Sequence, residues 1–313
     1  MHVIKRDGSK QELDLTQIRK QTIPACEGLN NVSYEKLELA VSYQMRDGIR
    51  SKDIQRALID AAHNLISVEH SDYAYVAARL SLYDIYHGIK RKHNKQGSGC
   101  VYEKISLLDN IEINKDVYDD FYTKYSKEEI LELDKVIESE RDLLFNYAGV
   151  KMLINRYLVK HIPEEIEDRK ELTIDYITEL PQHMFMCLAM YNMQDEDKDK
   201  RLQLVKETYE ITSKLEFIYP TPMLSNGRLK RGGLISCLVN TIPDDINGMF
   251  DKIKEIAIGS KHGAGWGIDA SDLRSTGASI GINKNASKGK LPILKVLNDI
   301  LLAIDQGGKS YAA

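Results

Sequence analysis

The stretch "LISCLVNTIPDD" (residues 234–245) places one cysteine in the middle of an apolar run and then stops the run with a proline and two aspartates. A short apolar run that ends at such a breaker predicts a buried strand. Cys237 is then either core filler, since a buried strand thiol is chemically quiet, or a residue required for its sulfur. Asp244 and Asp245 either cap the next helix or bind a ribose hydroxyl. Spacing alone leaves both alternatives open.

From residue 216 onward the sequence is rich in glycine, both before and after this stretch. Such backbone adopts positive φ or approaches a neighbour closely, which glycine does most cheaply. Thr221 lies between two prolines, where a hydroxyl either holds a phosphate oxygen or serves as an ordinary loop element. "GAGWG" (263–267) has GxGxG spacing and follows a helix-like segment, so it is not a dinucleotide fingerprint. It predicts a turn that passes close to another chain or ligand.

The N-terminal third has a short hairpin followed by helical patterns. Residues 3–13 surround Asp7-Gly8, a strong turn dipeptide. Helices are predicted over residues 15–26, 33–46, 51–66 and 71–92, with Ser33 and Ser51 as N-caps. The last of them carries an apolar stripe at helical spacing, made of Tyr75, Ala78, Leu82, Ile85 and Ile89. The basic run "KRKHNK" (90–95) predicts a solvated helix end.

The middle of the chain follows a linker, "HNKQGSGC" (93–100), and is mainly helical. Ser126 and Glu129 form a capping box that opens a long helical run. "IDYITELPQHMFMCLAMYNM" predicts a buried helix, in which Cys187 packs as a small hydrophobe. A solvated loop and a further helix follow.

Bulk properties exclude several classes of protein. The 313 residues carry a net charge of −4, so no nucleic-acid partner is indicated. No stretch is long and apolar enough to cross a membrane, and the N-terminus has no signal-peptide pattern. Four widely spaced cysteines without CxxC predict neither a disulfide framework nor a zinc site, and no metal is expected. Length suggests about two domains. We expect a reduced, cytoplasmic protein.

Several motifs in order along the chain identify a family. They are "VIKRDG", "DGIRSKDIQRALIDAA", "DYAYVAARL", "ERDLLFNYAGVKML", "YPTPMLSNG", "ISCLV", "AGWGIDASDLRSTG" and "DQGG". With these motifs the chain resembles the N-terminal part of the large, catalytic subunit of class I ribonucleotide reductase. The resemblance implies a mainly α chain with α/β parts. Residues 1–92 would form an ATP-cone, residues 93–215 a helical domain, and residues 216–313 the incomplete beginning of a ten-stranded α/β barrel, with "LISCLV" as its first strand.

The resemblance also implies roles for individual residues. Cys237 would donate to the departing 2′-hydroxyl and become half of the active-site disulfide, which requires a sulfur there. Thr221 and Ser236 would hold the substrate at its diphosphate and ribose. The allosteric specificity site would contain Asp244, Asp245, Arg274, Ile280, Gln306, Gly307 and Gly308. The ATP-cone site would contain Lys5, Arg6, Ser51 and Ile54.

The chain departs from the family pattern at several positions. Gln11, Gln17, Gln55 and His87 stand where a glutamate, a lysine, a histidine and a lysine are expected. Gln17 and His87 stand in place of the two lysines, so the phosphate site loses two fixed cations. The site is weakened, because charge-assisted hydrogen bonds are about twice as strong as neutral ones. The cone then serves as a nucleotide sensor or only as a scaffold. Ser310 stands where an arginine is usual, beside Lys309, so base stacking by a guanidinium is lost.

The implied ligands and partners follow from the family. ATP or dATP and deoxynucleotide effectors with Mg would bind this chain, while the radical metal cofactor would reside in a small partner subunit. A complementary C-terminal large-subunit polypeptide would complete the barrel, homodimerisation would occur at the specificity site, and thioredoxin or glutaredoxin would reduce the enzyme. The alternatives are a non-catalytic nucleotide-binding regulatory fragment and an adenosylcobalamin-dependent relative.

Overall fold

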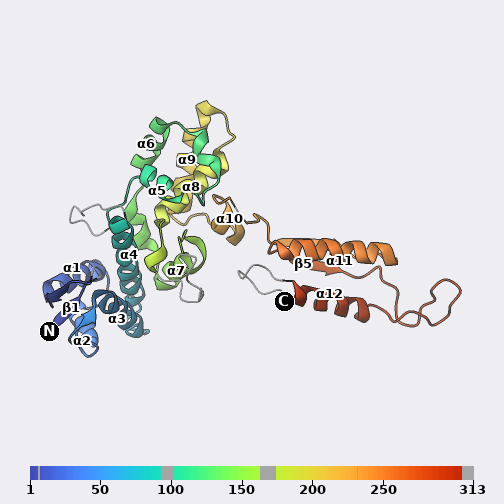
Figure 1. Cartoon of the computed structure of the whole chain (residues 1–313), viewed down its shortest axis with the longest axis horizontal. Coiled ribbons are helices and arrows are strands. Elements are labelled where there is room, and N and C mark those ends of the chain that lie inside the picture. The colour runs from blue at the N-terminus through green and yellow to red at the C-terminus, as the bar shows by residue number, and fades with distance from the viewer. Residues whose placement is uncertain (6–7, 93–101, 163–173, 231, 305–313) are drawn as a thin grey trace. The chain divides into compact units, whose positions relative to one another are not determined.

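The computed structural model describes residues 1–5, 8–92, 102–162, 174–230 and 232–304. The chain divides into two compact units, Met1–Tyr219 and Pro220–Ala313 (Figure 1). The described residues are mainly helical, with a three-stranded sheet in the first unit and a two-stranded sheet in the second, and they contain no closed barrel. The mainly α class with α/β parts is therefore confirmed.

The first unit begins with the predicted hairpin. β1 (His2–Ile4) pairs antiparallel with β2 (Lys10–Glu12), and β3 (Ile49–Arg50) adds in parallel on the other side of β1. Gly8 has a φ of +85°, a conformation that glycine adopts without the penalty of a Cβ atom. Four helices follow: α1 (Leu15–Cys26), α2 (Tyr34–Ser42), α3 (Ser51–Asn64) and α4 (Tyr73–Lys92). Their apolar faces enclose one core with β1.

Helix α4 connects this small N-terminal part to the helical region. It packs against α3 on one side and α7 (Tyr147–Met152) on the other (Figure 1). The predicted stripe is confirmed, because Ala78, Leu82, Ile85 and Ile89 are at most 1% exposed and Tyr75 is half-buried. The helix is buried beyond that stripe because it has neighbours on two faces.

One prediction near these helices was wrong, and another holds only in part. Ser33 caps α2 as expected, but Ser51 is the first residue of α3, and the cap position belongs to Arg50, which makes no side-chain cap bond. Arg91 and Lys92 at the basic end of α4 are exposed, as predicted, and residues 93–95 of the run lie outside the described residues, but two of the lysines also have partners. Lys90 pairs with Glu103 at 2.8 Å, and Lys92 donates to the Ile177 carbonyl at 2.8 Å. Desolvation lowers the pKa of Lys92 to about 8. The end of α4 thus lies against the helical region.

The helical region has several short helices and two longer ones, α8 (Pro181–Met193) and α9 (Lys198–Ser213). Its other elements are α5 (Leu107–Asn114), η1 (Asp120–Lys124), α6 (Lys127–Val136), η2 (Ser139–Leu144), α7, η3 (Leu153–Tyr157) and η4 (Ile174–Tyr176). The capping box of Ser126 and Glu129 is confirmed. The long helix expected after it is wrong, because the backbone becomes extended at Ile137 and Asn146 caps a new helix through Gly149 N.

Helix α8 is the centre of this region. Its residues from Pro181 to Met190 are buried, as predicted, and Cys187 has an exposed fraction of 0%. The packing role of that cysteine is therefore confirmed. Among the described residues, no helix combines the length and apolarity needed to cross a membrane.

The second unit is a strand–helix–strand arrangement with two further helices. Its elements are α10 (Thr221–Asn226), β4 (Cys237–Thr241), α11 (Ile246–Lys261), β5 (Gly265–Asp269) and α12 (Leu291–Ala303). β4 and β5 pair in parallel, with Cys237 opposite Gly265 and Thr241 opposite Asp269. A core of Ile242, Ile253, Ile256, Leu273 and Leu297 joins α11 and α12 to the sheet.

Two expectations about this unit were wrong. "GAGWG" is a turn only at its start, where Gly263 has a φ of +85°, and Gly265, Trp266 and Gly267 lie in β5. The close approach expected there occurs within the chain, since a Cβ on Gly259 would lie 2.5 Å from the Trp266 ring. The strand that carries Cys237 was expected to be buried, but it has no buried residue and Cys237 is exposed, because nothing among the described residues covers that face of the two-stranded sheet.

Candidate functional site

The first candidate site lies at the start of β4. Cys237 is exposed, and its Sγ lies 3.7 Å from the Ser236 hydroxyl. The Ser236 carbonyl accepts a hydrogen bond from Gly265 N at 2.6 Å, so the sheet fixes the backbone beside the cysteine. Thr221 is the exposed first residue of α10. An accessible thiol on a fixed strand can undergo thiol–disulfide exchange, whereas a buried thiol cannot.

The segment between Thr221 and Cys237 is held by two residues that sequence reasoning missed. Asn226 Nδ2 donates to the Gly233 carbonyl at 2.9 Å. Gly232 has a φ of +117°, and a Cβ there would lie 2.3 Å from the Asn226 amide. Arg228 is fully buried and donates to the Leu224 carbonyl at 2.7 Å. The available signals were the Asn-Gly dipeptide at 226–227 and the glycine pair of "KRGG".

The second candidate site lies where β4 leads into α11. Asp245 caps α11, since its Oδ1 accepts from Gly248 N at 2.8 Å. Asp244 instead pairs with Arg274, whose Nε lies 2.6 Å from Asp244 Oδ2 and whose Nη2 donates to the Asp244 carbonyl. Nη1 of the same arginine donates to the Ser279 carbonyl at 3.1 Å. The two aspartates therefore have different structural roles.

The same loop carries Ile280. Its backbone pairs with Asn283, with N–O distances of 2.9 and 3.0 Å, and its side chain is 47% exposed. Arg274 thus connects the end of β4 to the loop that bears Ile280. Gln306, Gly307 and Gly308, which were assigned to the same site, lie outside the described residues, as do Lys309 and Ser310.

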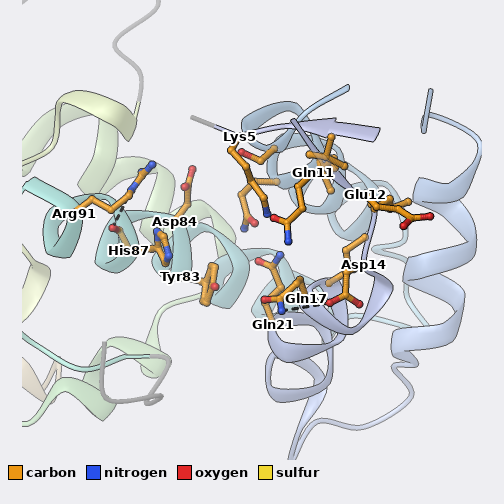
Figure 2. A pocket seen from close by; sticks show the side chains of 16 residues that line it. Lys5, Gln11, Glu12, Asp14, Gln17, Gln21, Tyr83, Asp84, His87 and Arg91 are labelled. Carbon is orange, nitrogen blue, oxygen red and sulfur yellow. Dashed lines mark hydrogen bonds between the residues drawn. The ribbon is translucent and has the colours of Figure 1, made fainter. Parts of the chain in front are cut away.

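The third candidate site is a cavity of about 410 Å³ in the first unit, which we call the cone cavity (Figure 2). Its walls come from β1, β2, α1, α3 and α4. It is lined by Val3, Lys5, Gln11, Glu12, Leu13, Asp14, Gln17, Ile18, Gln21, Ser51, Ile54, Gln55, Tyr83, Asp84, His87 and Arg91. The structure therefore brings together three of the four residues assigned to the ATP-cone site, and Arg6 lies outside the described residues.

The glutamines that depart from the family pattern all line this cavity. Gln55 is 6% exposed and donates to the Leu80 carbonyl at 3.0 Å, so it ties α3 to α4. Gln17 Nε2 lies 3.5 Å from Asp14 Oδ2. Across the cavity, the ring of Tyr83 stacks on His87 at 5.8 Å, and burial raises the pKa of the Tyr83 phenol. The cavity therefore combines polar side chains with apolar ones and has one aromatic wall.

Three family models match the chain, and together they cover most of it. Residues 1–88 match the ATP cone domain, residues 143–232 match the all-alpha domain of ribonucleotide reductase, and residues 235–313 match its barrel domain. The barrel match begins just before Ser236 and Cys237, and the cone match contains nearly all of the cone cavity. The chain belongs to the ribonucleotide reductase large-subunit family.

Curated relatives agree with this assignment. The ribonucleoside-diphosphate reductase subunit alpha of Helicobacter pylori (strain ATCC 700392 / 26695) is 39% identical over 315 residues, covering 99% of this chain and 37% of the relative. The corresponding subunit of Enterobacteria phage T4 is 35% identical, covering 98% and 38%. Subunit alpha of reductase 1 from Escherichia coli (strain K12) is 31% identical, again covering 98% and 38%. The chain thus spans less than two-fifths of these ribonucleotide reductase subunits.

Proposed function

We propose that this chain forms the N-terminal part of a ribonucleoside-diphosphate reductase catalytic subunit, which reduces ribonucleoside diphosphates to 2′-deoxyribonucleotides by radical chemistry. The observation that carries the proposal is the exposed Cys237 on β4 beside Ser236, within the region that matches the barrel domain. An exposed thiol at a fixed strand position suits a redox role and contributes little as core packing.

In the proposed reaction, the 2′-hydroxyl leaves as water, a hydrogen replaces it, and two thiols become one disulfide. The Cys237 thiol supplies a proton to the departing hydroxyl and one sulfur of the disulfide. Ser236 and Thr221 hold the ribose and the diphosphate. A reductant such as thioredoxin or glutaredoxin then restores the thiols by exchange. The radical would come from a small metal-bearing subunit. A cytoplasmic location would keep these thiols reduced between turnovers.

The second cysteine and the rest of the barrel must come from outside the described residues. β4 exposes Val239 at 89%, and Ile235 just before the strand is 68% exposed. Apolar strand faces of this kind are normally covered by further structure. We propose that a complementary C-terminal large-subunit polypeptide supplies the covering strands. A homodimer would form around the loop that carries Arg274.

The allosteric part of the proposal concerns two sites. A deoxynucleotide effector with Mg would bind near Asp244 and Arg274, where the guanidinium lies between a carboxylate and a carbonyl. Gln306, Gly307 and Gly308 would transmit its identity to the substrate. The cone cavity would bind ATP or dATP through Lys5, Arg6, Ser51 and Ile54.

The test is substitution of Cys237 in the assembled enzyme. Cys237→Ser should abolish deoxynucleotide formation by the complex of this chain, the C-terminal polypeptide and the small subunit, while assembly on gel filtration is retained. Cys26→Ser is the matched control, since that half-buried thiol lies in the other unit and should leave turnover unchanged. Unchanged turnover of Cys237→Ser would contradict the assignment. Stimulation by adenosylcobalamin without the small subunit would indicate the cobalamin-dependent relative.

A second candidate function is a nucleotide-binding regulatory fragment without chemistry. The observation that favours it is that the Asp244–Arg274 pair and the cone cavity are both formed by this chain alone. It predicts effector binding that Asp244→Ala weakens, together with no reductase activity with any partner. Deoxynucleotide production by the assembled complex would exclude it.

A further inference from the structure

Helix α10 carries a proposed substrate residue at one end and Asn226 at the other. Thr221, proposed to hold the diphosphate, is its first residue, and Asn226 is its last. A helix of this length keeps its two ends about 7–8 Å apart. Its last turn is closed by Gly227 N, which donates to the Met223 carbonyl at 2.8 Å. The position of Asn226 is therefore fixed relative to that of Thr221.

The side chain of Asn226 holds a segment that lies further along the chain. Its Nδ2 donates to the Gly233 carbonyl at 2.9 Å. The amide also lies directly against Gly232, where a Cβ would be 2.3 Å from Asn226 Cγ and 2.6 Å from its Nδ2. Gly232 has a φ of +117°, so any other residue there would both clash with the amide and strain the backbone.

The other amide atom of Asn226 is unsatisfied. Oδ1 is buried, and none of the residues that the structure describes donates to it. Leaving a buried acceptor unpaired costs free energy. Such a group calls for an explanation other than stability. We therefore consider what the bond from Nδ2 to Gly233 fixes.

The segment after Gly233 leads directly to the proposed reactive residues. Ser236 and Cys237 follow it by three and four positions. The Ser236 carbonyl accepts from Gly265 N at 2.6 Å, and Cys237 lies opposite Gly265 in the sheet. Three residues span about 10 Å at most. The short segment is thus held by Asn226 at one end and by β5 at the other.

We propose that Asn226 is a positioning residue, which sets the separation between Thr221 at the diphosphate and Ser236 and Cys237 at the ribose. This role rests on the proposed function and adds a residue that acts through the others. The covalent structure of a ribonucleoside diphosphate limits the distance between its diphosphate and its 2′-hydroxyl. The protein must hold the two anchors at a matching separation, and a misplacement of about 1 Å lowers a rate by about 100-fold.

The first test is steady-state kinetics of the complex of this chain, the C-terminal polypeptide and the small subunit, with CDP as substrate. Asn226→Asp keeps the shape of the side chain and removes the donor to Gly233. It should lower kcat by about tenfold or more and leave KM within about threefold, because Thr221 and Ser236 remain in place. Asn298→Asp, the same change at an exposed position of α12, is the matched control and should leave both constants unchanged.

A double-mutant cycle separates positioning from a general structural role. Thr221→Ala removes the diphosphate anchor, so the separation that Asn226 sets no longer matters. Adding Asn226→Asp to Thr221→Ala should then lower turnover by less than about threefold, whereas independent effects would multiply.

A second measurement uses the chain alone. The Gly265 amide donates to the Ser236 carbonyl and therefore reports on the position of Ser236. Its hydrogen exchange should be about tenfold faster in Asn226→Asp, because the segment before Ser236 is no longer held. Trp266, the single tryptophan of the sequence, lies opposite Leu238 in the sheet. Unchanged Trp266 fluorescence shows that the sheet of the variant is still folded.

A glycine pair provides an independent variant. Gly232→Ala should speed exchange at Gly265 in the same way, because the new Cβ displaces the Asn226 amide. Gly281→Ala is the matched control, since Gly281 also has a positive φ, of +57°, but no atom near enough to meet a Cβ. It should leave exchange at Gly265 unchanged.

The outcomes separate this role from the proposed function. If Cys237→Ser is inactive but Asn226→Asp turns over within about threefold of the wild type, the positioning role is refuted and the proposed function stands. Multiplicative effects in the cycle, or unchanged exchange at Gly265 in Asn226→Asp, also refute the positioning role. Unchanged turnover of Cys237→Ser, or an inactive wild-type complex, refutes the proposed function and this role with it.

Discussion

The two units of the chain differ in how fully they bury their apolar residues. In the first unit, Leu37, Leu58 and Leu80 have exposed fractions of 0%. In the second, Val239 is 89% exposed and Leu291 is 80% exposed. The first unit encloses its own core, whereas the strand faces of the second are open to solvent. The candidate residues Ser236 and Cys237 lie in the unit whose strand faces are open, and this openness leaves the Cys237 thiol accessible.

The largest predicted effect contrasts two leucines. Leu58→Ala should lower the free energy of unfolding of the first unit by about 2–5 kcal/mol, because it removes a fully buried side chain. Leu291→Ala, at an exposed position of the second unit, should change stability by about 0.5 kcal/mol or less. Urea unfolding followed by circular dichroism measures both. Equal losses in the two variants would contradict the contrast in burial.

The next effect concerns a buried carboxyl in the first unit. Asp142 is fully buried, accepts from Tyr86 at 2.7 Å and from Gln182 at 2.8 Å, and lies close to Tyr209. Desolvation raises its pKa to about 7. Because the folded-state pKa is raised, the stability it contributes is complete below about pH 4 and is lost as the pH rises towards 7.

Asp142→Asn should abolish this dependence of the unfolding free energy on pH. In the wild-type chain the size of the pKa shift corresponds to about a few kcal/mol of unfolding free energy. The measurement is the unfolding free energy of both proteins at several pH values between 4 and 8. A slope that persists in the variant would assign the titration to another group. Tyr86→Phe should keep the slope, since the buried carboxyl remains.

Helix caps offer a matched pair across the units. Ser126 Oγ accepts from Glu129 N at 3.2 Å in the first unit, and Asp245 Oδ1 accepts from Gly248 N at 2.8 Å in the second. Replacing either by alanine should cost about 1 kcal/mol locally. Amide hydrogen exchange should show faster exchange in the first turn of α6 or of α11, respectively. If the amides of the first turn exchange no faster in one of the variants, tertiary packing alone stabilises the N-terminal end of that helix.

The smallest effect is expected at the Asp244–Arg274 pair. Both side chains are about one-third exposed, so the pair should contribute no more than about 1 kcal/mol to stability. Arg274→Lys should therefore leave thermal unfolding almost unchanged while loosening the loop around Ser279. A large loss of stability would show that this pair belongs to the core of the second unit. The two units would then differ less in how fully they bury their residues.

Local signals in the sequence predicted local structure well. The Asp-Gly hairpin, the Ser126 capping box and the uniformly apolar α8 all depend on residues within a few positions of each other. The prediction of one long helix after Ser126 was wrong, because breaks at Ile137 and Asn146 depend on local backbone turns that leave the apolar pattern unchanged. The role of Ser51 as a cap was wrong because strand β3 runs directly into α3.

By itself, the sequence determined the family, the N-terminal hairpin with the helices that follow it, and the candidates Cys237, Asp244 and Asp245. Only the tertiary structure decided that Cys237 is exposed, that Asp244 pairs with Arg274, and that four glutamines from three elements line one cavity. The physical reason is the separation along the sequence over which each interaction acts. Caps, turns and periodicity act over a few residues, whereas burial and charge pairing depend on which distant segments the fold brings together.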